Sequence, residues 1–378
     1  MILPGATLGV LGGGQLGRMF TMRAREMGYR VLVLEPDPGS PAGAVGDEHI
    51  RAAYDDPEAL DRLAARAAAV TVEFENVPAR ALERLAERVP VRPAARAVAI
   101  AQDRIREKCF LRDHGFATAR FGVVSRPEEL EPAWEAVGAP ALLKTSRLGY
   151  DGKGQAGVDS LEALEPAFAT LGGVPCILEE RLELERELSV VLVRGADGTV
   201  VPFPVGENTH CQGILETTVV PAEVDAGLAG EASRLAGEVA ARLDYVGVLG
   251  VELFVAGGRV FVNEIAPRPH NTGHYTLDAC SVDQFEQQIR ALCGLPLGAP
   301  ALLSPVAMIN LLGDLWSGGT PRWDRALALP NVKLHLYGKA EPRPGRKMGH
   351  LNCLAPTPRE ALALARRAHA ALLDHPSP

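Results

Sequence analysis

The chain has 378 residues, too many for one ordinary hydrophobic core, so two or three domains are expected. Its formal net charge of −8 disfavours bulk electrostatic binding of nucleic acid, and no apolar run approaches the ~20 residues of a membrane-spanning helix. No basic segment followed by an apolar stretch opens the chain, so we expect no signal peptide. The six cysteines are scattered without a C-x-x-C pair, which favours free thiols in a reducing cytoplasm over a zinc site.

The first elements predict a βαβ unit. A buried strand over 7–11 leads into a glycine-rich run at 12–17 and a helix, and the next strand ends at Glu35. This pattern satisfies the dinucleotide fingerprint, which taken alone indicates NAD. Glycines nevertheless let a backbone approach any anion at a helix N-terminus, so a phosphorylated small substrate is an equal interpretation. We therefore expect substrate contacts at Gly14, Gln15 and Leu16.

A third strand is predicted over 69–74, with polar side chains at its carboxyl end, where parallel sheets bind ligands. Glu73 and Asn76 are candidates for substrate contacts. The alternative for Glu73 is a charge at the N-terminus of the helix that starts near Pro78. A segment rich in Pro, Arg and Ala near 90–100 predicts the first domain boundary.

A strand over 141–144 ends at Lys144, and the loop 145–155 that follows contains three glycines and Lys153. Such a loop is able to fold over phosphates and present its backbone N–H groups to them. The G-x-x-x-x-G-K-[ST] pattern of a P-loop is absent. A plain hairpin turn is the alternative interpretation.

The strand over 176–180 ends in acidic residues, which indicates the adenosine side of a nucleotide site. Glu179 and the backbone near Arg181 and Leu182 are placed to meet an adenine amine and ring nitrogen. Glu187 is placed to accept hydrogen bonds from ribose hydroxyls, and His210 is expected to point toward the nucleotide. The alternative for the glutamates is a charged edge strand.

Residues 248–274 predict a β-hairpin followed by a polar loop. The two strands run over 251–255 and 260–265, on either side of a turn at 256–258. If the turn centres on Gly258, Glu252 lies opposite Glu264 and both carboxylates leave one face. Paired carboxylates suit Mg²⁺, which completes its coordination with phosphates and water. Asn263 would join them only if a bulge turned it to that face, and two solvated glutamates are the alternative.

The last segment, from about residue 301, predicts further strands, a basic loop and a closing helix. The loop holds two prolines and places five basic groups within twelve residues. Lys339, Arg346 and Lys347 are among these basic groups. Such a loop is typical of an anion clamp, and a solvated surface loop is the alternative. The predicted domains are therefore 1–100, 101–300 and 301–378.

Six motifs in this order resemble the ATP-grasp superfamily and, within it, the 5-(carboxyamino)imidazole ribonucleotide synthetases of purine biosynthesis. They are GGGQLGRM at 12–19, EFENVP at 73–78, QDR at 102–104, LKTSRLGYDGKGQ at 143–155, NEIAPRPHNTGH at 263–274 and YGK…RPGRKMGH at 337–350. The departures are small: Thr272 and Tyr275 stand where the family often has Ser and Trp, and Leu336 where an aromatic residue is frequent. The resemblance implies an α/β and α+β multidomain protein, with an ATP-grasp fold between an N-terminal Rossmann-like βαβ domain and a small β-rich C-terminal domain.

The resemblance also implies a reaction and its residues. ATP would phosphorylate bicarbonate to carboxyphosphate, which would carboxylate the amine of 5-aminoimidazole ribonucleotide, with no biotin involved. The residues implied for ATP are Arg104, Lys144, Gly149, Tyr150, Asp151, Gly152, Lys153, Gly154, Gln155, Glu179, Glu180, Arg181, Leu182, Glu187, His210, Asn263 and Glu264. Mg²⁺ would lie on Glu252 and Glu264.

The remaining implied residues would face bicarbonate and the ribonucleotide. They are Tyr150, Asp151, Arg268, His270 and Asn271, with Lys339, Arg346 and Lys347 around the ribonucleotide phosphate. Arg268 would stabilise the carboxyphosphate anion, and Asp151 would orient or deprotonate the attacking amine. A cytoplasmic homodimer with no nucleic-acid or membrane partner is the family expectation.

Three alternatives stay open at this point. One is another ATP-grasp enzyme, such as formate-dependent glycinamide ribonucleotide transformylase or a biotin carboxylase. The second is an NAD-dependent oxidoreductase built on the glycine fingerprint, although nothing after residue 35 supplies a hydride-transfer site. The third is a nucleotide-binding regulatory protein that has lost catalysis.

Overall fold

The computed structural model describes residues 1–149 and 152–373, and its first part is a parallel sheet of order β3-β2-β1-β4. Apolar side chains cover both faces of this sheet, so its strands read as continuous hydrophobic runs. The elements are β1 (Thr7–Leu11), α1 (Gln15–Glu26), β2 (Arg30–Leu34), β3 (Glu48–Ile50), α2 (Pro57–Arg66), β4 (Ala69–Val72) and α3 (Ala79–Ala86). The predicted βαβ unit is present, and the carboxyl ends of β1, β2 and β4 carry the glycine run, Glu35 and Glu73.

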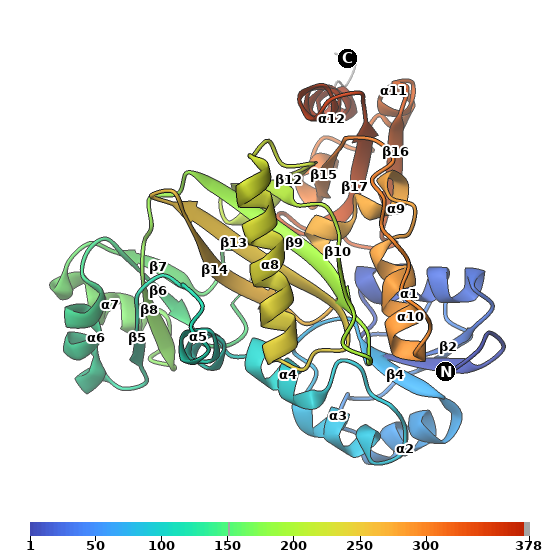
Figure 1. Cartoon of the computed structure of the whole chain (residues 1–378), viewed down its shortest axis with the longest axis horizontal. Coiled ribbons are helices and arrows are strands. Elements are labelled where there is room, and N and C mark those ends of the chain that lie inside the picture. The colour runs from blue at the N-terminus through green and yellow to red at the C-terminus, as the bar shows by residue number, and fades with distance from the viewer. Residues whose placement is uncertain (150–151, 374–378) are drawn as a thin grey trace.

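Two helices lead to a small antiparallel sheet of order β5-β8-β6-β7. Helices α6 and α7 pack on this sheet, at the left of Figure 1, and β6 and β7 form a hairpin around the second glycine-rich loop. The elements are α4 (Ala95–Ala101), α5 (Arg104–Asp113), β5 (Phe121–Val124), α6 (Leu130–Val137), β6 (Ala141–Thr145), β7 (Gln155–Val158), α7 (Leu161–Thr170) and β8 (Cys176–Glu180).

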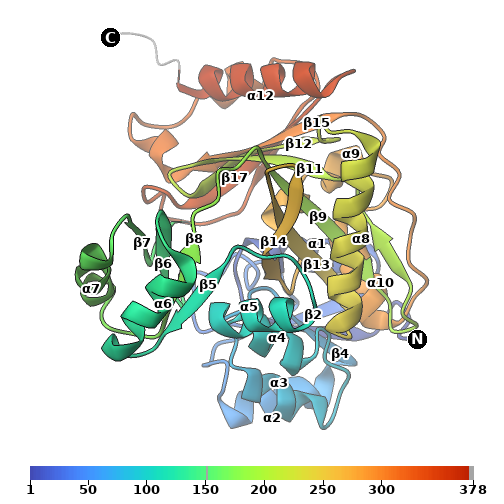
Figure 2. The same cartoon turned by 60° about the vertical axis from the view of Figure 1, so that its left-hand side comes forward.

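A nine-stranded antiparallel sheet forms the centre of the molecule, in the order β14-β13-β9-β11-β12-β15-β17-β16, with β10 paired to β9. Helix α8 lies across β9 and β13, and α12 covers the C-terminal strands, as both views show (Figures 1 and 2). The elements are β9 (Arg186–Arg194), β10 (Val200–Pro202), β11 (Gly206–Cys211), β12 (Ile214–Val220), α8 (Ala226–Arg242), β13 (Gly247–Ala256), β14 (Arg259–Ala266), α9 (Thr276–Ala279), α10 (Gln284–Cys293), β15 (Val306–Leu312), α11 (Trp323–Leu327), β16 (Val332–Leu336), β17 (Lys347–Leu354) and α12 (Pro358–Leu373).

Main-chain pairing links parts of the chain that the sequence separates. Strand β12 pairs with β15, so the central sheet continues across residue 300, where the sequence predicts a domain boundary. Helix α10 packs its Phe285, Ile289 and Leu292 into the core of the N-terminal sheet. Within residues 1–149 and 152–373, none of the helices combines the length and apolarity needed to cross a bilayer. These connections place the ends of β1, β2 and β4 beside the loops that follow β14 and β16.

Candidate active site

The β13–β14 hairpin places Glu252 directly opposite Glu264, as the sequence predicts, but the turn and the strand register that produce this pairing differ from the prediction. Its turn is the two-residue Gly257-Gly258 pair, with φ of +55° and +68°, values that glycine adopts without strain. A regular ladder from this turn would pair Glu252 with Asn263. The register shifts between Glu252 and Leu253, so Asn263 becomes the extra residue of a bulge and Glu264 moves opposite Glu252. The bulge required to bring Asn263 toward the carboxylates is therefore present.

The two facing carboxylates differ in how readily they ionise. Burial, followed by the charge of Glu264, raises the pKa of Glu252 to about 7. Burial also opposes ionisation of Glu264, but the guanidinium of Arg104 outweighs it and holds the pKa at about 2. Among the described residues, no group of three or more His, Cys, Asp or Glu side chains is arranged to hold a metal ion. A cation would therefore rely on this pair and on oxygens from a nucleotide, which fits the needs of Mg²⁺.

One face of helix α5 delivers three charged side chains to this region. Asp103 caps the helix by accepting from the N–H groups of Ile105 and Arg106. Arg104 then donates from Nη1 to Glu264 Oε2 at 2.9 Å and from Nη2 to the Gly149 carbonyl at 3.2 Å. Arg104 thus joins the carboxylate hairpin to the second glycine-rich loop, consistent with its predicted place beside ATP.

Glu107 and Lys108 follow Arg104 one helical turn later on the same face, and both are almost fully buried. Glu107 Oε1 accepts from the N–H of Ile265 at 2.5 Å, next to Glu264 on β14. Burial, then the charge of Glu264, raises the pKa of Glu107 to about 8. Neither residue was predicted as part of the site. The available signal was their spacing of three and four from Arg104.

Glu179, which was predicted to meet an adenine amine, lies between two lysine side chains. Lys144 Nζ lies 2.5 Å from Glu179 Oε2 and Lys108 Nζ lies 3.1 Å from Oε1, so both oxygens face ammonium groups. Burial alone would raise the pKa of Glu179, but the two lysines hold it at about 2. The side chain therefore orders Lys144 at the end of β6. Its neighbour Glu180 forms a two-point ion pair with Arg120 near the surface.

Glu187 and His210 meet on the central sheet. His210 Nδ1 lies 2.7 Å from Glu187 Oε2. Burial disfavours the charged imidazole, but the hydrogen bond to Glu187 and the charge of Glu252 outweigh it and raise the pKa of His210. Both predicted nucleotide ligands therefore lie within electrostatic reach of Glu252. Arg181 and Leu182 follow the end of β8, where the Arg181 N–H donates to Pro140 O at 2.9 Å.

The second glycine-rich loop is closed by backbone contacts. Thr145 N donates to Gly154 O at 2.8 Å, and a Cβ on Gly154 would lie 2.6 Å from Thr145 Oγ1. Gly152, with φ of +75°, lies against the β11–β12 turn, where a Cβ would meet Gln212 O at 2.9 Å. Lys153 and Gln155 are exposed beside it. The predictions for Tyr150 and Asp151 lie outside the described residues.

Arg268 lies between the carboxylate hairpin and the end of β4. Its Nε donates to Glu75 Oε2 at 2.5 Å, and the charge of Arg268 overcomes burial to lower the pKa of Glu75. Glu75 was not among the predicted site residues, although it belongs to the same EFENVP motif as Glu73. This ion pair ties β4 of the N-terminal sheet to the loop after β14.

The ring of His270 lies between Thr272 and Glu252. Its Nδ1 is 2.8 Å from Thr272 Oγ1, and its Nε2 is 3.5 Å from Glu252 Oε1. Burial, then the charge of Arg268, lowers the pKa of His270 to about 3. Gln284, which was also missed, fixes the main chain of His270 by accepting from its N–H and donating to its carbonyl, each at 2.8 Å.

Asn271, which was predicted to face the ribonucleotide, lies beside Asn310 on β15. Its amide exchanges hydrogen bonds with the amide of Asn310, at 3.1 and 2.9 Å, and the residue is buried. The pair holds the loop after β14 against β15. Asn271 therefore supports the loop that carries Arg268 and His270.

A cavity of about 210 Å³ opens between the first glycine run and the basic C-terminal loop. Lys339 and Arg346 line it together with Gly14 and Glu73, so four of the predicted substrate residues meet here. Lys339 Nζ donates to Lys347 O at 2.7 Å, and Arg346 Nη1 donates to Glu341 O at 2.9 Å. The prediction of a clamp formed by one basic loop against the βαβ unit fits this arrangement.

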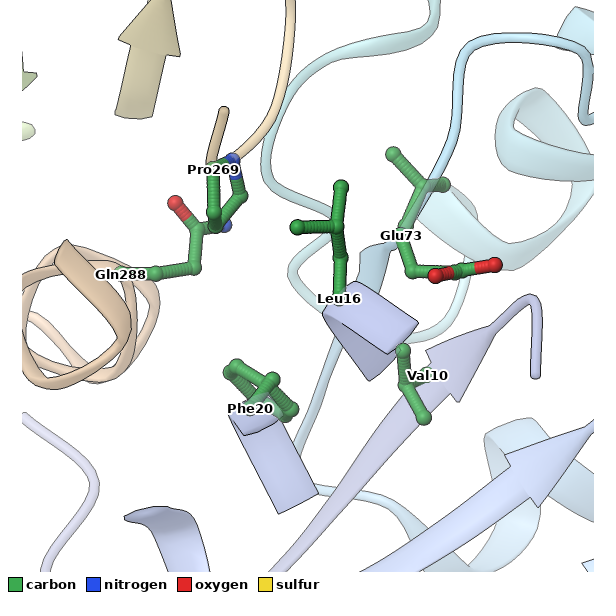
Figure 3. A pocket seen from close by; sticks show the side chains of 7 residues that line it. Val10, Leu16, Phe20, Glu73, Pro269 and Gln288 are labelled. Atoms are coloured by element: carbon green, nitrogen blue, oxygen red, sulfur yellow. The ribbon is translucent and has the colours of Figure 1, made fainter. Parts of the chain in front are cut away.

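Lys347 accepts the Lys339 hydrogen bond with its carbonyl, while the charge of its side chain acts elsewhere. Its charge acts on Glu252, His210 and His270, so it belongs to the surroundings of the carboxylate pair. The side chain of Leu16 packs with Val10, Phe20 and Pro269 around a small void (Figure 3). Only the backbone of Leu16 is left for substrate, and Gln15 and Asn76 remain partly exposed nearby.

Glu73 closes the N-terminus of α1. Its Oε1 accepts from Gly14 N at 2.8 Å and its Oε2 accepts from Gly17 N at 3.0 Å. Burial raises the pKa of Glu73, although these two N–H groups oppose the shift. Neither sequence interpretation anticipated this contact, since Glu73 was assigned to substrate or to the helix near Pro78. A pyrophosphate at this helix terminus would compete with the Glu73 carboxylate, which argues against the NAD interpretation.

Comparisons with known proteins return matches along nearly the whole chain. The ribonucleotide synthetase preATP-grasp domain matches residues 5–102, the ATP-grasp domain residues 109–285, and the phosphoribosylaminoimidazole carboxylase C-terminal domain residues 306–364. The N5-carboxyaminoimidazole ribonucleotide synthase of Brucella melitensis is 47% identical over 356 residues, which cover 93% of this chain and 97% of the relative.

Solved structures resemble the chain over a similar span. A crystal structure of an ADP complex of N5-carboxyaminoimidazole ribonucleotide synthetase superposes with a TM-score of 0.93 at 41% identity, covering 98% of this chain and 97% of that one. The synthase of Aspergillus clavatus in complex with ADP and 5-aminoimidazole ribonucleotide gives a TM-score of 0.89 at 33% identity, covering 97% and 98%.

Proposed function

Because the chain belongs to the N5-carboxyaminoimidazole ribonucleotide synthase family, we propose that it uses ATP to carboxylate 5-aminoimidazole ribonucleotide in purine biosynthesis. These matches confirm the resemblance inferred from the motifs. They also confirm the ATP-grasp fold with an N-terminal and a C-terminal domain beside it. The carboxyl donor in this proposal is bicarbonate, and the products are the carboxyamino ribonucleotide, ADP and phosphate.

One observation carries the proposal: the carboxylate pair and the basic cavity lie on two sides of a single strand end. Glu73 lines the cavity, and Glu75, two residues later, binds Arg268 within reach of the charge of Glu264. A phosphorylated small molecule in the cavity would therefore lie close to a nucleotide held at the hairpin. This arrangement suits transfer between two substrates, which a nucleotide-binding regulatory protein does not need.

The nucleotide side of the proposal uses Arg104, Lys144 and the second glycine-rich loop. Phosphoryl transfer breaks the bond between the γ-phosphorus and its bridging oxygen while an oxygen of bicarbonate bonds to phosphorus, so negative charge must be neutralised on both sides. Lys144, oriented by Glu179, and Arg104, oriented by Glu264, are fixed cations for this purpose. Glu252 and Glu264 would hold Mg²⁺, which would supply further positive charge to that neutralisation.

The second step joins the ribonucleotide amine to the carboxyl carbon. The amine nitrogen forms the new bond, the carboxyl carbon releases phosphate, and the nitrogen gives up a proton. Buried Arg268 is placed to bind the carboxyphosphate anion, and Nε2 of His270 is placed to contact an oxygen of the same group. The intermediate is easily hydrolysed, so burial of these side chains and a glycine loop over the phosphates would exclude water.

The experiment that tests this function is an ADP-release assay with bicarbonate or formate, each with and without 5-aminoimidazole ribonucleotide. We expect release to require bicarbonate and to rise with the ribonucleotide. Lys339→Ala should raise the KM for the ribonucleotide roughly tenfold or more while leaving the KM for ATP near its wild-type value. Formate-dependent release, or an unchanged ribonucleotide KM, would contradict the proposal. A cytoplasmic homodimer remains part of the proposal, and sedimentation tests whether the protein is a dimer.

A further inference from the structure

The cavity between the first glycine run and the C-terminal loop is lined by charged groups of both signs. Lys339 and Arg346 supply cations, and Glu35, Asp37 and Glu73 supply carboxylates. A sugar phosphate has matching chemistry, because its phosphate needs cations and its hydroxyl groups need acceptors. The carboxylates would repel the phosphate, so only one orientation is favourable.

Glu35 is the most strongly constrained acid in this cavity. It follows β2, and only 9% of its surface is exposed. Its Oε1 accepts from the Asp37 N–H at 2.9 Å, its Oε2 accepts from the Tyr54 hydroxyl, and its carbonyl is 2.8 Å from His49 Nε2. Each carboxylate oxygen has two acceptor positions, so two positions remain open. The group is held in one orientation and keeps capacity for two further donors.

The Glu35 side chain also lies directly against the first glycine run. A Cβ on Gly13 would come within 2.4 Å of Glu35 Cγ and 2.1 Å of Ser40 Oγ, so only glycine permits this approach. In a dinucleotide-binding unit the acid after the second strand accepts from ribose hydroxyls. Here the carboxylate of Glu73 occupies the helix N-terminus, where a dinucleotide would place its pyrophosphate. Glu35, the acid at the ribose-binding position, remains available for a ligand.

We propose that Glu35 binds the ribose hydroxyls of the ribonucleotide substrate and selects it over a 2′-deoxyribose compound. This inference rests on the proposed function, which places the ribonucleotide phosphate at Lys339 and Arg346. Two neighbouring hydroxyls match the two open acceptor positions of one carboxylate. Loss of the 2′-hydroxyl leaves one acceptor of a buried charge without a donor, which disfavours the deoxy compound.

The test compares ribose 5-phosphate with 2-deoxyribose 5-phosphate as competitors of the ribonucleotide in the ADP-release assay. For the wild-type protein we expect ribose 5-phosphate to bind about tenfold more tightly. Glu35→Gln should remove most of this preference and raise the ribonucleotide KM about tenfold without changing the KM for ATP. Asp37→Asn is the matched control, since it removes a charge from the same cavity and should keep the preference.

The sign of the effect separates two explanations. If Glu35 contributed only negative charge, its removal would strengthen phosphate binding and lower the ribonucleotide KM. Equal inhibition of the wild-type protein by the two sugar phosphates would overturn the inference even if the variant fails to fold, as would an undiminished preference in a folded Glu35→Gln protein. Wild-type turnover that ignores the ribonucleotide would instead overturn the proposed function.

Discussion

The two glycine-rich loops of this chain look alike in sequence but contact different kinds of groups. In the first, at 12–17, the N–H groups of Gly14 and Gly17 donate to the carboxylate of Glu73. In the second, between β6 and β7, the described contacts join the backbone to Arg104, to Thr145 and to the β11–β12 turn. The first loop is closed by an internal anion, and the second is attached to the residues proposed to bind nucleotide.

Glycine spacing therefore gives an anion access to backbone N–H groups but does not determine which anion binds there. In the first loop a strand end 56 residues further along the chain supplies the carboxylate. Substitutions around the first loop should therefore act on stability and on the sugar-phosphate cavity. Substitutions around the second should act on phosphoryl transfer with little effect on stability.

The largest effect expected from this contrast is that of Glu264→Gln. It removes a carboxylate from the proposed Mg²⁺ position and the partner of Arg104, next to the second loop. We expect ADP formation to fall about a thousandfold or more, while the thermal midpoint stays close to wild type, because Gln can still accept from Arg104. ADP release and thermal unfolding measured on the same preparation check both parts.

The control for Glu264→Gln contacts the turn of the same hairpin from the residue before β9. Glu185 accepts from Gly258 N at 3.0 Å at the exposed turn, far from the carboxylate pair, so Glu185→Gln should retain activity. Wild-type turnover in Glu264→Gln would remove the metal role and with it the proposed phosphoryl transfer. A loss of activity in both variants would point to distortion of the hairpin.

The hairpin shows how far sequence reasoning reaches. Alternation and the adjacent glycines predicted the strands and the pairing of Glu252 with Glu264. The prediction placed the turn centre on Gly258, whereas the turn lies between Gly257 and Gly258 and a bulge at Asn263 restores the pairing. Next to the bulge, the hairpin also contacts another element, because Glu107 on α5 accepts from the N–H of Ile265. No local pattern in the hairpin carries that information.

The residues that sequence reasoning missed share this long-range character. Lys108 reaches Glu179, Glu75 reaches Arg268 and Gln284 reaches His270, each through a partner far away or on another element. The motifs led to side chains that cluster in loops, which became the predicted ligand contacts. Buried partners that orient them lie inside helices and strand ends, where a charged or amide residue has no distinctive neighbours in the sequence.

The second prediction concerns Glu73→Ala. It leaves the N–H groups of Gly14 and Gly17 without their acceptor and removes a negative charge from the N-terminus of α1. We expect a loss of about 1–2 kcal/mol in the free energy of unfolding, measured by urea titration, with the KM for ATP unchanged. Glu73→Gln should lose less, because its amide oxygen replaces one of the two acceptors. Wild-type stability in Glu73→Ala would mean that water or another group accepts from the N–H groups of Gly14 and Gly17. It would contradict the inference that Glu73 closes the first loop.

The smallest effect expected is that of Gly152→Ala in the second loop. Its positive φ disfavours alanine by about 1 kcal/mol, and the new methyl group would approach Gln212 O within 2.9 Å. We expect the loop to shift away from the β11–β12 turn and the KM for ATP to rise by up to about tenfold, with the ribonucleotide KM nearly unchanged. Gly157→Ala on β7 is the matched control, since a Cβ there meets nothing within 4 Å. An ATP KM that rises equally in both variants would mean that β7 as a whole, and not the contact with the turn, governs nucleotide binding.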